Sequence, residues 1–188
     1  KTAYEIHERL VGSEMCIRDR PSILILPILE DNFLPVYSGI DDGKRWTKLS
    51  LGILKSAIDF AILRKDVHVL IRPRSYEMLS IQNTLNSFKN IPSNVEVSYK
   101  GNIEDKIKNT WCLVGHNSTA LLEGLAAGKV VIEPEFYEAS LSEYKEFIVD
   151  LSGATKIAKS EKELIFLMDK YTKLKPKISL DLDKKVLY

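Results

Sequence analysis

The chain has 188 residues, the size of a single domain. It is 45% hydrophobic and 28% charged, as in ordinary globular proteins, and no apolar run approaches the roughly 18 residues that span a membrane. Its 27 basic and 26 acidic residues leave a net charge of +1, which argues against a nucleic-acid partner. Cys16 and Cys112 show no metal-ligand spacing, so we expect no metal site and a reducing, cytoplasmic location.

The first 20 residues, KTAYEIHERLVGSEMCIRDR, resemble translated sequencing-adapter read-through at the edges of unrelated environmental sequences. We therefore expect residues 1–20 to be a non-native segment that packs poorly and contributes nothing to a site. The preceding part of a longer protein would then be missing. The alternative is a genuine amphipathic helix.

Residues 21–173 are predicted to form one α/β domain of alternating strands and helices. Strands are expected at 22–29, 67–71, 94–99, 111–114, 130–132 and 154–157, and helices at 48–65, 76–89, 102–109, 118–127 and 160–171, with 141–151 as a further candidate. Such alternation predicts a Rossmann-like three-layer α/β/α domain with a mostly parallel six-stranded sheet in the order 3-2-1-4-5-6. Helical spacing directs Leu51, Leu79 and Leu122 toward the core, and Thr47 is the expected cap of the first helix.

The first strand is followed by a long loop over 30–45, and loops of this length are often functional. Tyr37, Ser38 and Gly39 in it are candidate ligand contacts, although an ordinary surface loop is an equal alternative. The charged tail over 174–188 contains a D-x-D pattern at Asp181–Asp183, which we interpret as chance because no buried strand precedes it.

Two arginines, Arg72 and Arg74, follow the second predicted strand at its carboxyl end. Guanidinium groups bind phosphate through paired hydrogen bonds, so these residues are candidate phosphate ligands. The alternative is a solvated basic loop.

The stretch WCLVGHNSTALLEGLAAGKVVIEP over 111–134 reads as strand, tight turn, helix and strand. Asn117 or Ser118 is the expected N-cap, and unpaired N–H groups at the helix start would form an anion site. Ser118 and Thr119 add hydroxyls there, and Glu123, one turn along, can accept from ribose hydroxyls. Phosphate and ribose together indicate a nucleotide; the alternative is that these residues only cap a helix and face solvent.

Three segments resemble a known family: His116–Thr119, Leu122–Gly124 and Gly128–Pro134. Their pattern is similar to the N-S-[ST]-x-x-x-E-x-x-x-x-G-x-P-V-I signature of the nucleotide-sugar-binding, C-terminal domain of GT-B glycosyltransferases. Within this family, the pattern is most similar to that of the bacterial capsule and surface-polysaccharide transferases. Val130 stands where the family usually has proline, and Arg74 with Ser75 replaces the family's His-Pro after Arg72-Pro73.

This resemblance implies one half of a GT-B fold and a glycosyltransferase whose isolated half is inactive. The implied donor-binding residues are Tyr37, Ser38, Gly39, Arg72, Arg74, Gly115, His116, Asn117, Ser118, Thr119 and Glu123. The implied partners are a nucleotide-sugar donor as co-substrate, a glycan or lipid-linked acceptor and the missing N-terminal GT-B domain. No metal or other cofactor is required, and the implied location is cytoplasmic, with peripheral attachment to the inner membrane face as an option.

The sequence does not identify the catalytic residues. His116 is a weak acid–base candidate, because a structural or capping role suits a loop histidine better. A different enzyme built on a similar half, a nucleotide-sugar 2-epimerase, would need carboxylates facing the sugar, for which Glu133, Glu135 and Glu138 are the candidates. The pattern is also compatible with a polyol-phosphate transferase and with a non-catalytic Rossmann-like binding domain.

Overall fold

The computed structural model describes residues 20–28, 45–151 and 153–174. One sheet within them contains β1 (Ser22–Leu26), β2 (His68–Ile71), β3 (Val95–Val97), β4 (Cys112–Gly115), β5 (Val130–Pro134) and β6 (Lys156–Ala158). The helices are α2 (Thr47–Leu63), α3 (Met78–Asn86), α4 (Ile103–Lys108), α5 (Thr119–Ala126) and α6 (Glu161–Lys173). Short 3₁₀ helices in the same ranges are η1 (Ser75–Glu77), η2 (Tyr137–Ser140) and η3 (Ser142–Phe147).

The strand order is β3-β2-β1-β4-β5-β6, and every neighbouring pair is parallel. Leu24 of β1 lies opposite Leu70 of β2 on one side and Leu113 of β4 on the other. The predicted Rossmann-like sheet and its 3-2-1-4-5-6 order are therefore confirmed. The order reverses between β1 and β4, and folds of this kind bind ligands outside the carboxyl ends of the strands at that point.

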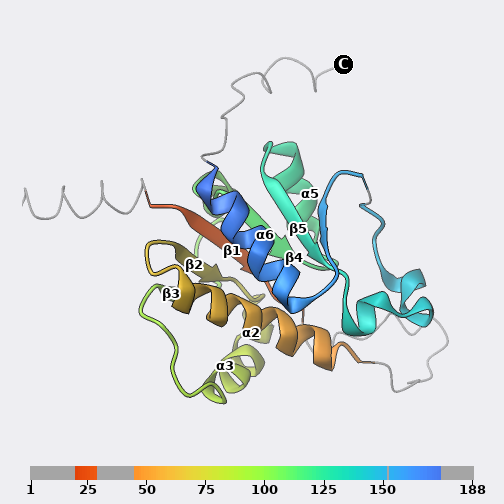
Figure 1. Ribbon diagram of the computed structural model, residues 1–188, viewed down its shortest axis with the longest axis horizontal. Coiled ribbons are helices and arrows are strands. Elements are labelled where there is room, and N and C mark those ends of the chain that lie inside the picture. Colours follow the sequence, from red (N-terminus) through yellow and green to blue (C-terminus); the bar gives the residue numbers. More distant parts are fainter. Residues whose placement is uncertain (1–19, 29–44, 152, 175–188) are drawn as a thin grey trace, which may run out of the picture.

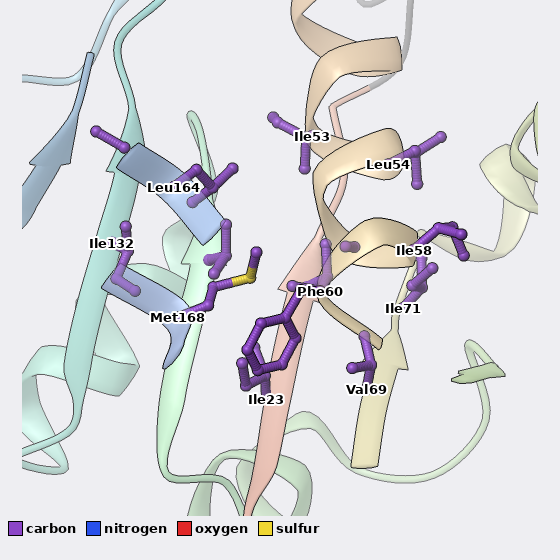
Figure 2. Packing of buried hydrophobic residues seen from close by; sticks show 14 of the residues in the cluster. Ile23, Ile53, Leu54, Ile58, Phe60, Val69, Ile71, Ile132, Leu164 and Met168 are labelled. Atoms are coloured by element: carbon purple, nitrogen blue, oxygen red, sulfur yellow. The ribbon is translucent and has the colours of Figure 1, made fainter. Parts of the chain in front are cut away.

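Helices cover both faces of the sheet, because successive side chains of a strand point to opposite faces. Ile23 and Ile25 of β1 pack into the layer of α2, α3 and α6, whereas Leu24 and Leu26 pack toward α4 and α5. Figure 1 shows α2 and α6 side by side across one face of the sheet. Figure 2 shows their contact, in which Phe60 of α2 lies near Met168 of α6 above the strands.

Three local predictions were wrong at this level. The helix predicted over 76–89 is divided into η1 and the shorter α3, and the segment 141–151 contains only η3. Thr47 is the first residue of α2 rather than its cap; the N-cap position is Trp46, whose side chain forms no capping hydrogen bond.

Some apolar residues face solvent instead of the core. Leu79 is 72% exposed, Leu122 48% and Leu51 42%, contrary to the helical spacing argument. Within the described ranges, no helix combines the length and the apolar character that crossing a bilayer requires. Tyr37, Ser38 and Gly39, the segment 1–19 and most of the predicted tail lie outside the described residues.

Candidate functional site

A cavity of about 310 Å³, hereafter the first cavity, opens at the carboxyl ends of β1, β2 and β4. Its lining includes seven of the predicted donor-binding residues: Arg72, Arg74, His116, Asn117, Ser118, Thr119 and Glu123. Leu26, Tyr99 and Ile103 contribute apolar surface. The structure therefore brings the two arginines and the β4–α5 turn, which are distant in sequence, to one place.

The β4–α5 turn is shaped by close packing at Gly115 and a left-handed residue at Asn117. A Cβ on Gly115 would lie 3.0 Å from Leu26 Cβ and 3.1 Å from the Leu26 carbonyl oxygen, so a larger residue would push β4 away from β1. Gly115, the last residue of β4, is a predicted donor-binding residue that does not line the first cavity. Asn117 has φ of 50°, and its side-chain oxygen accepts a 3.1 Å hydrogen bond from the Val149 backbone N–H.

The N-terminus of α5 opens into the first cavity. Ser118 occupies the N-cap position with extended backbone angles, but its hydroxyl forms no capping hydrogen bond. The first N–H groups of a helix have no partner inside the helix. They carry part of the positive end of the helix dipole, so this turn is suited to an anion. The Ser118 and Thr119 hydroxyls, which also line the cavity, can donate to the same anion.

Gly124 allows α5 to lie close to the sheet. A Cβ at this position would stand 2.7 Å from Cδ2 of the buried Leu113, far inside normal contact. Glu123, the preceding residue, is exposed and lines the first cavity about one turn beyond the helix start. Its carboxylate is thus near the anion site but separate from it, as a ribose ligand would have to be.

The two arginines reach the first cavity by different means. Both terminal nitrogens of Arg72 donate to backbone carbonyls, one to Lys100 and one to Gly101 at 2.8 Å each, which ties β2 to the segment before α4. Arg74 lies over the Tyr76 ring, with its guanidinium carbon 6.0 Å from the ring centroid. Its side chain is half exposed, and one of its nitrogens lies 3.5 Å from the carboxylate of Glu77.

Glu77 is a residue of the cavity that sequence reasoning missed. It is 2% exposed, and its carboxylate also accepts a 2.8 Å hydrogen bond from the Arg74 backbone N–H. This buried carboxylate beside Arg74 offsets part of the charge of the arginine. Tyr99, which also lines the cavity, was missed as well; its position as the last residue of a predicted strand was the available signal.

His116 is buried deep in the turn before α5. It is only 4% exposed, and neither ring nitrogen has a hydrogen-bond partner among the described residues. Its ring packs edge-on against Trp46, with centroids 5.2 Å apart. Burial lowers the pKa of His116 from 6.5 to about 4, and the charge of Glu135 opposes this only weakly. The ring is therefore neutral at pH 7, with one donor and one acceptor nitrogen.

A second cavity of about 360 Å³ lies beside the carboxyl end of β5, and His116 lines this cavity too. Glu133 is 6% exposed and accepts a 2.7 Å hydrogen bond from the Thr155 hydroxyl. Burial raises the pKa of Glu133, and the charges of Asp150 and Glu135 act in the same direction. Motif reasoning did not reveal this cavity, because its residues come from β5, η3 and the segments around them.

The three carboxylates predicted for an epimerase do not converge on one site. Glu133 and Glu135 line the second cavity, and Glu135 is paired with Lys159. Glu138 instead accepts from the backbone N–H groups of Lys48 at 2.9 Å and Leu49 at 2.7 Å. Glu138 therefore caps α2, a role that the sequence analysis had predicted for Thr47. Among the described residues, no group of three or more His, Cys, Asp and Glu side chains is placed to hold a metal ion.

The fold is similar to those of several solved glycosyltransferases. The glycotransferase of kitacinnamycin aligns with a TM-score of 0.50 and 11% identity, over 81% of this chain and 35% of its own. CalG4, the calicheamicin glycosyltransferase, aligns with a TM-score of 0.49 and 14% identity, over 82% and 34%. KpsC of Thermosulfurimonas dismutans, a β-Kdo 2,4 transferase, gives 0.42 and 14%, over 91% and 56%.

Neither a family model nor a curated protein matches the sequence. The chain spans 35% and 34% of the lengths of the first two structures. At these identities the likeness establishes the fold: a mostly parallel six-stranded α/β domain of the kind that glycosyltransferases contain.

Proposed function

We propose that this chain is the donor-binding half of a glycosyltransferase, and that its first cavity holds the nucleoside diphosphate of a nucleotide-sugar. The observation that carries the proposal is that the uncapped N-terminus of α5 opens into the first cavity. Ser118, Thr119 and Glu123 line the same cavity. Phosphate suits the helix N-terminus and the two hydroxyls, and ribose hydroxyls suit the Glu123 carboxylate. The fold it has in common with the kitacinnamycin glycotransferase supports the same class.

The chemistry of transfer gives these groups a role beyond binding. The bond between the anomeric carbon and the diphosphate oxygen breaks, and its electron pair leaves on the diphosphate. An acceptor hydroxyl oxygen bonds to the anomeric carbon and loses its proton. Charge therefore grows on the diphosphate, where the N–H groups of α5, the Ser118 hydroxyl and Arg72 stabilise it. With these groups in place no metal ion is required.

The acceptor and the general base belong, in this proposal, to a second domain facing the carboxyl edge of the sheet. The acceptor class that fits the surface-polysaccharide resemblance is a glycan or lipid-linked glycan. The protein would then work in the cytoplasm, at the inner face of the membrane. The chain by itself is expected to bind nucleotide without transferring sugar. Robust transfer by the purified 188-residue chain would overturn its assignment as one half of the enzyme.

The nucleotide site is tested by calorimetric titration with the nucleoside diphosphates of uracil, guanine, adenine, cytosine and thymine, and then with the matching monophosphate and nucleoside. Affinity should rise with each phosphate, because the positive end of α5 acts on the phosphates alone. Failure of all five diphosphates to bind at millimolar concentration would refute the proposal.

Glu123→Ala gives a sharper result. Loss of a hydrogen bond to a charged group costs about 1.5–3 kcal/mol, so the diphosphate should bind roughly 10- to 150-fold more weakly. The 2′,3′-dideoxy form of the same nucleotide should bind wild type and variant equally, since it lacks the hydroxyls in question. Glu143→Ala, at an exposed glutamate that lines neither cavity, is the matched control. An equal loss for both nucleotides would show that Glu123 does not bind ribose.

A further inference from the structure

Asn117, in the turn before α5, adopts a backbone conformation that favours glycine. Its φ of 50° lies in the left-handed region, where asparagine is tolerated better than most residues and glycine is tolerated best. Its side chain, however, makes a contact that glycine cannot make. The Oδ1 atom accepts a 3.1 Å hydrogen bond from the Val149 backbone N–H, 32 residues further along the chain. This bond attaches the turn to a distant segment that follows β5.

That segment, residues 137–149 and hereafter the bridge segment, is itself fixed to the rest of the fold. Near its start, the carboxylate of Glu138 accepts from two backbone N–H groups of α2. In its middle, the hydroxyl of the buried Tyr144 donates to the Arg45 carbonyl at 3.1 Å. The N–H of Val149, at its end, therefore belongs to an anchored backbone, and a hydrogen bond from it can hold the turn in place.

The position of this turn decides how well the start of α5 can bind an anion. Asn117 directly precedes Ser118, the N-cap residue, so the backbone at 117 sets the direction in which the first N–H groups of the helix point. Donors that are already aimed at a charge need no reorganisation when the charge arrives. If the turn rotated freely, only a fraction of the molecules would be competent, and the apparent affinity would fall by that fraction.

We propose that Asn117 is a positioning residue: through its bond to Val149 it holds the start of α5 in the conformation that binds the diphosphate. This role rests on the proposed donor site in the first cavity. It differs from the direct donor contact that the family resemblance implies for Asn117. Because Asn117 also lines the first cavity, its amide nitrogen could donate to a phosphate itself, and the experiment has to separate the two roles.

Val149→Pro separates them, because it removes the N–H and leaves the Asn117 side chain unchanged. The preceding residue, Ile148, has φ of −101° and ψ of 126°, the extended conformation that a following proline requires. Titration calorimetry with the nucleoside diphosphate that binds in the titrations above should show roughly 2- to 12-fold weaker binding, the range for one neutral hydrogen bond. Val149→Ala keeps the N–H, so as the matched control it should bind like wild type. The nucleoside, which has no phosphate, should bind all three proteins equally.

Asn117→Gly breaks the same bond from the other side. Glycine adopts the left-handed backbone without strain, so only the side chain is lost. Its loss of diphosphate affinity should match that of Val149→Pro, and the double variant should lose no more than either single variant, because both changes remove one interaction. Thermal unfolding checks that each variant is folded. If Val149→Pro does not fold, the α-hydroxy-acid counterpart of valine at position 149 removes the same N–H without restricting the backbone.

The outcomes separate this role from the donor site itself. If wild type binds no diphosphate, the donor site is wrong, and the positioning role falls with it. If the diphosphate binds and only Asn117→Gly weakens it, Asn117 contacts the phosphate directly and the positioning role is wrong. If neither change weakens binding, the turn keeps its shape without the bond, and the positioning role is again wrong. An equal loss for nucleoside and diphosphate would also overturn it, because the effect would not be confined to the anion site.

Discussion

Two of the helices that begin beside the carboxyl edge of the sheet, α2 and α5, differ in how the backbone N–H groups at their N-termini are paired. At α2 the carboxylate of Glu138 accepts hydrogen bonds from the backbone N–H groups of Lys48 and Leu49. At α5 the residue in the N-cap position, Ser118, forms no capping hydrogen bond, and the helix faces the first cavity. One positive helix end is thus closed by the protein's own carboxylate, and the other is open to a ligand.

This difference indicates where an anionic ligand can bind. In many Rossmann-like folds the phosphates lie at the helix after the first strand, which here is α2. Glu138 already fills that position with a negative charge, so a phosphate there would be repelled. The turn that presents Glu138 begins at Tyr137, whose φ of 52° is uncommon outside glycine. Its hydroxyl donates to Glu161 at 2.8 Å, which holds the turn in place.

His116 and Trp46 connect the two helix starts, and the largest predicted effect concerns this contact. The pKa of His116 is lowered by burial from 6.5 to about 4, so the unfolded chain binds a proton at a higher pH than the folded chain. Stability from this residue is complete above about pH 6.5 and is lost as the pH falls toward 4. The loss should approach roughly 3 kcal/mol.

Urea unfolding of wild type and His116→Gln between pH 7 and pH 4 measures this loss. The free energy of unfolding of the variant should depend less on pH, because glutamine does not titrate. Three carboxylates also have lowered pKa values, and their contribution to stability is lost at still lower pH in both proteins: Asp66, Asp169 and Glu161. The difference between the stability–pH curves of wild type and variant therefore isolates the contribution of His116. Parallel curves would mean that the imidazole is already hydrated or charged in the folded protein.

The next largest effect on stability is expected when the carboxylate at the closed end of α2 is removed. Glu138→Ala should lower the free energy of unfolding by about 1–2 kcal/mol, because two charge-assisted hydrogen bonds to α2 are lost at a partly exposed site. Glu138→Gln should lose less, since its amide oxygen can still accept. Glu143→Ala at the exposed neighbouring glutamate is the control for charge alone. A loss equal to that of Glu143→Ala would show that the Glu138 cap contributes nothing to stability.

The open helix end was predictable from sequence, whereas the closed one was not. Gly115, Asn117, Ser118 and Gly124 lie within ten residues, and the strand–turn–helix pattern that they form is visible in the local sequence. Their distant contacts, from Gly115 to Leu26 and from Asn117 to Val149, were not. Glu138 reaches Lys48 across a sequence separation of 90 residues, and only the packing of η2 on α2 brings them together. Residue spacing carries no signal for such a contact.

The same reasoning explains the errors in the core. Leu122 was predicted inward because the periodicity of α5 fits several faces, but Gly124 occupies the position against Leu113 and rotates Leu122 outward. Leu79 was placed inward on a helix starting at residue 76, whereas α3 begins at Met78 after a 3₁₀ turn. The second cavity lacked any motif, because its carboxylates and Lys145 belong to segments whose arrangement depends on tertiary contacts.

The smallest predicted effect compares two serines in the same N-cap position. Ser160 caps α6, where its hydroxyl accepts a 3.2 Å hydrogen bond from the Glu163 backbone N–H, so Ser160→Ala should cost about 1 kcal/mol of stability. Ser118 forms no such bond, so Ser118→Ala should change stability by less than about 0.5 kcal/mol. The same substitution should nevertheless weaken binding of a nucleoside diphosphate while leaving the nucleoside unaffected, because the hydroxyl serves the phosphate. Denaturant unfolding and calorimetry on both variants decide the matter. A stability loss at Ser118 as large as at Ser160 would mean that its hydroxyl caps α5 in solution, and the contrast between the open and closed helix ends would then not hold.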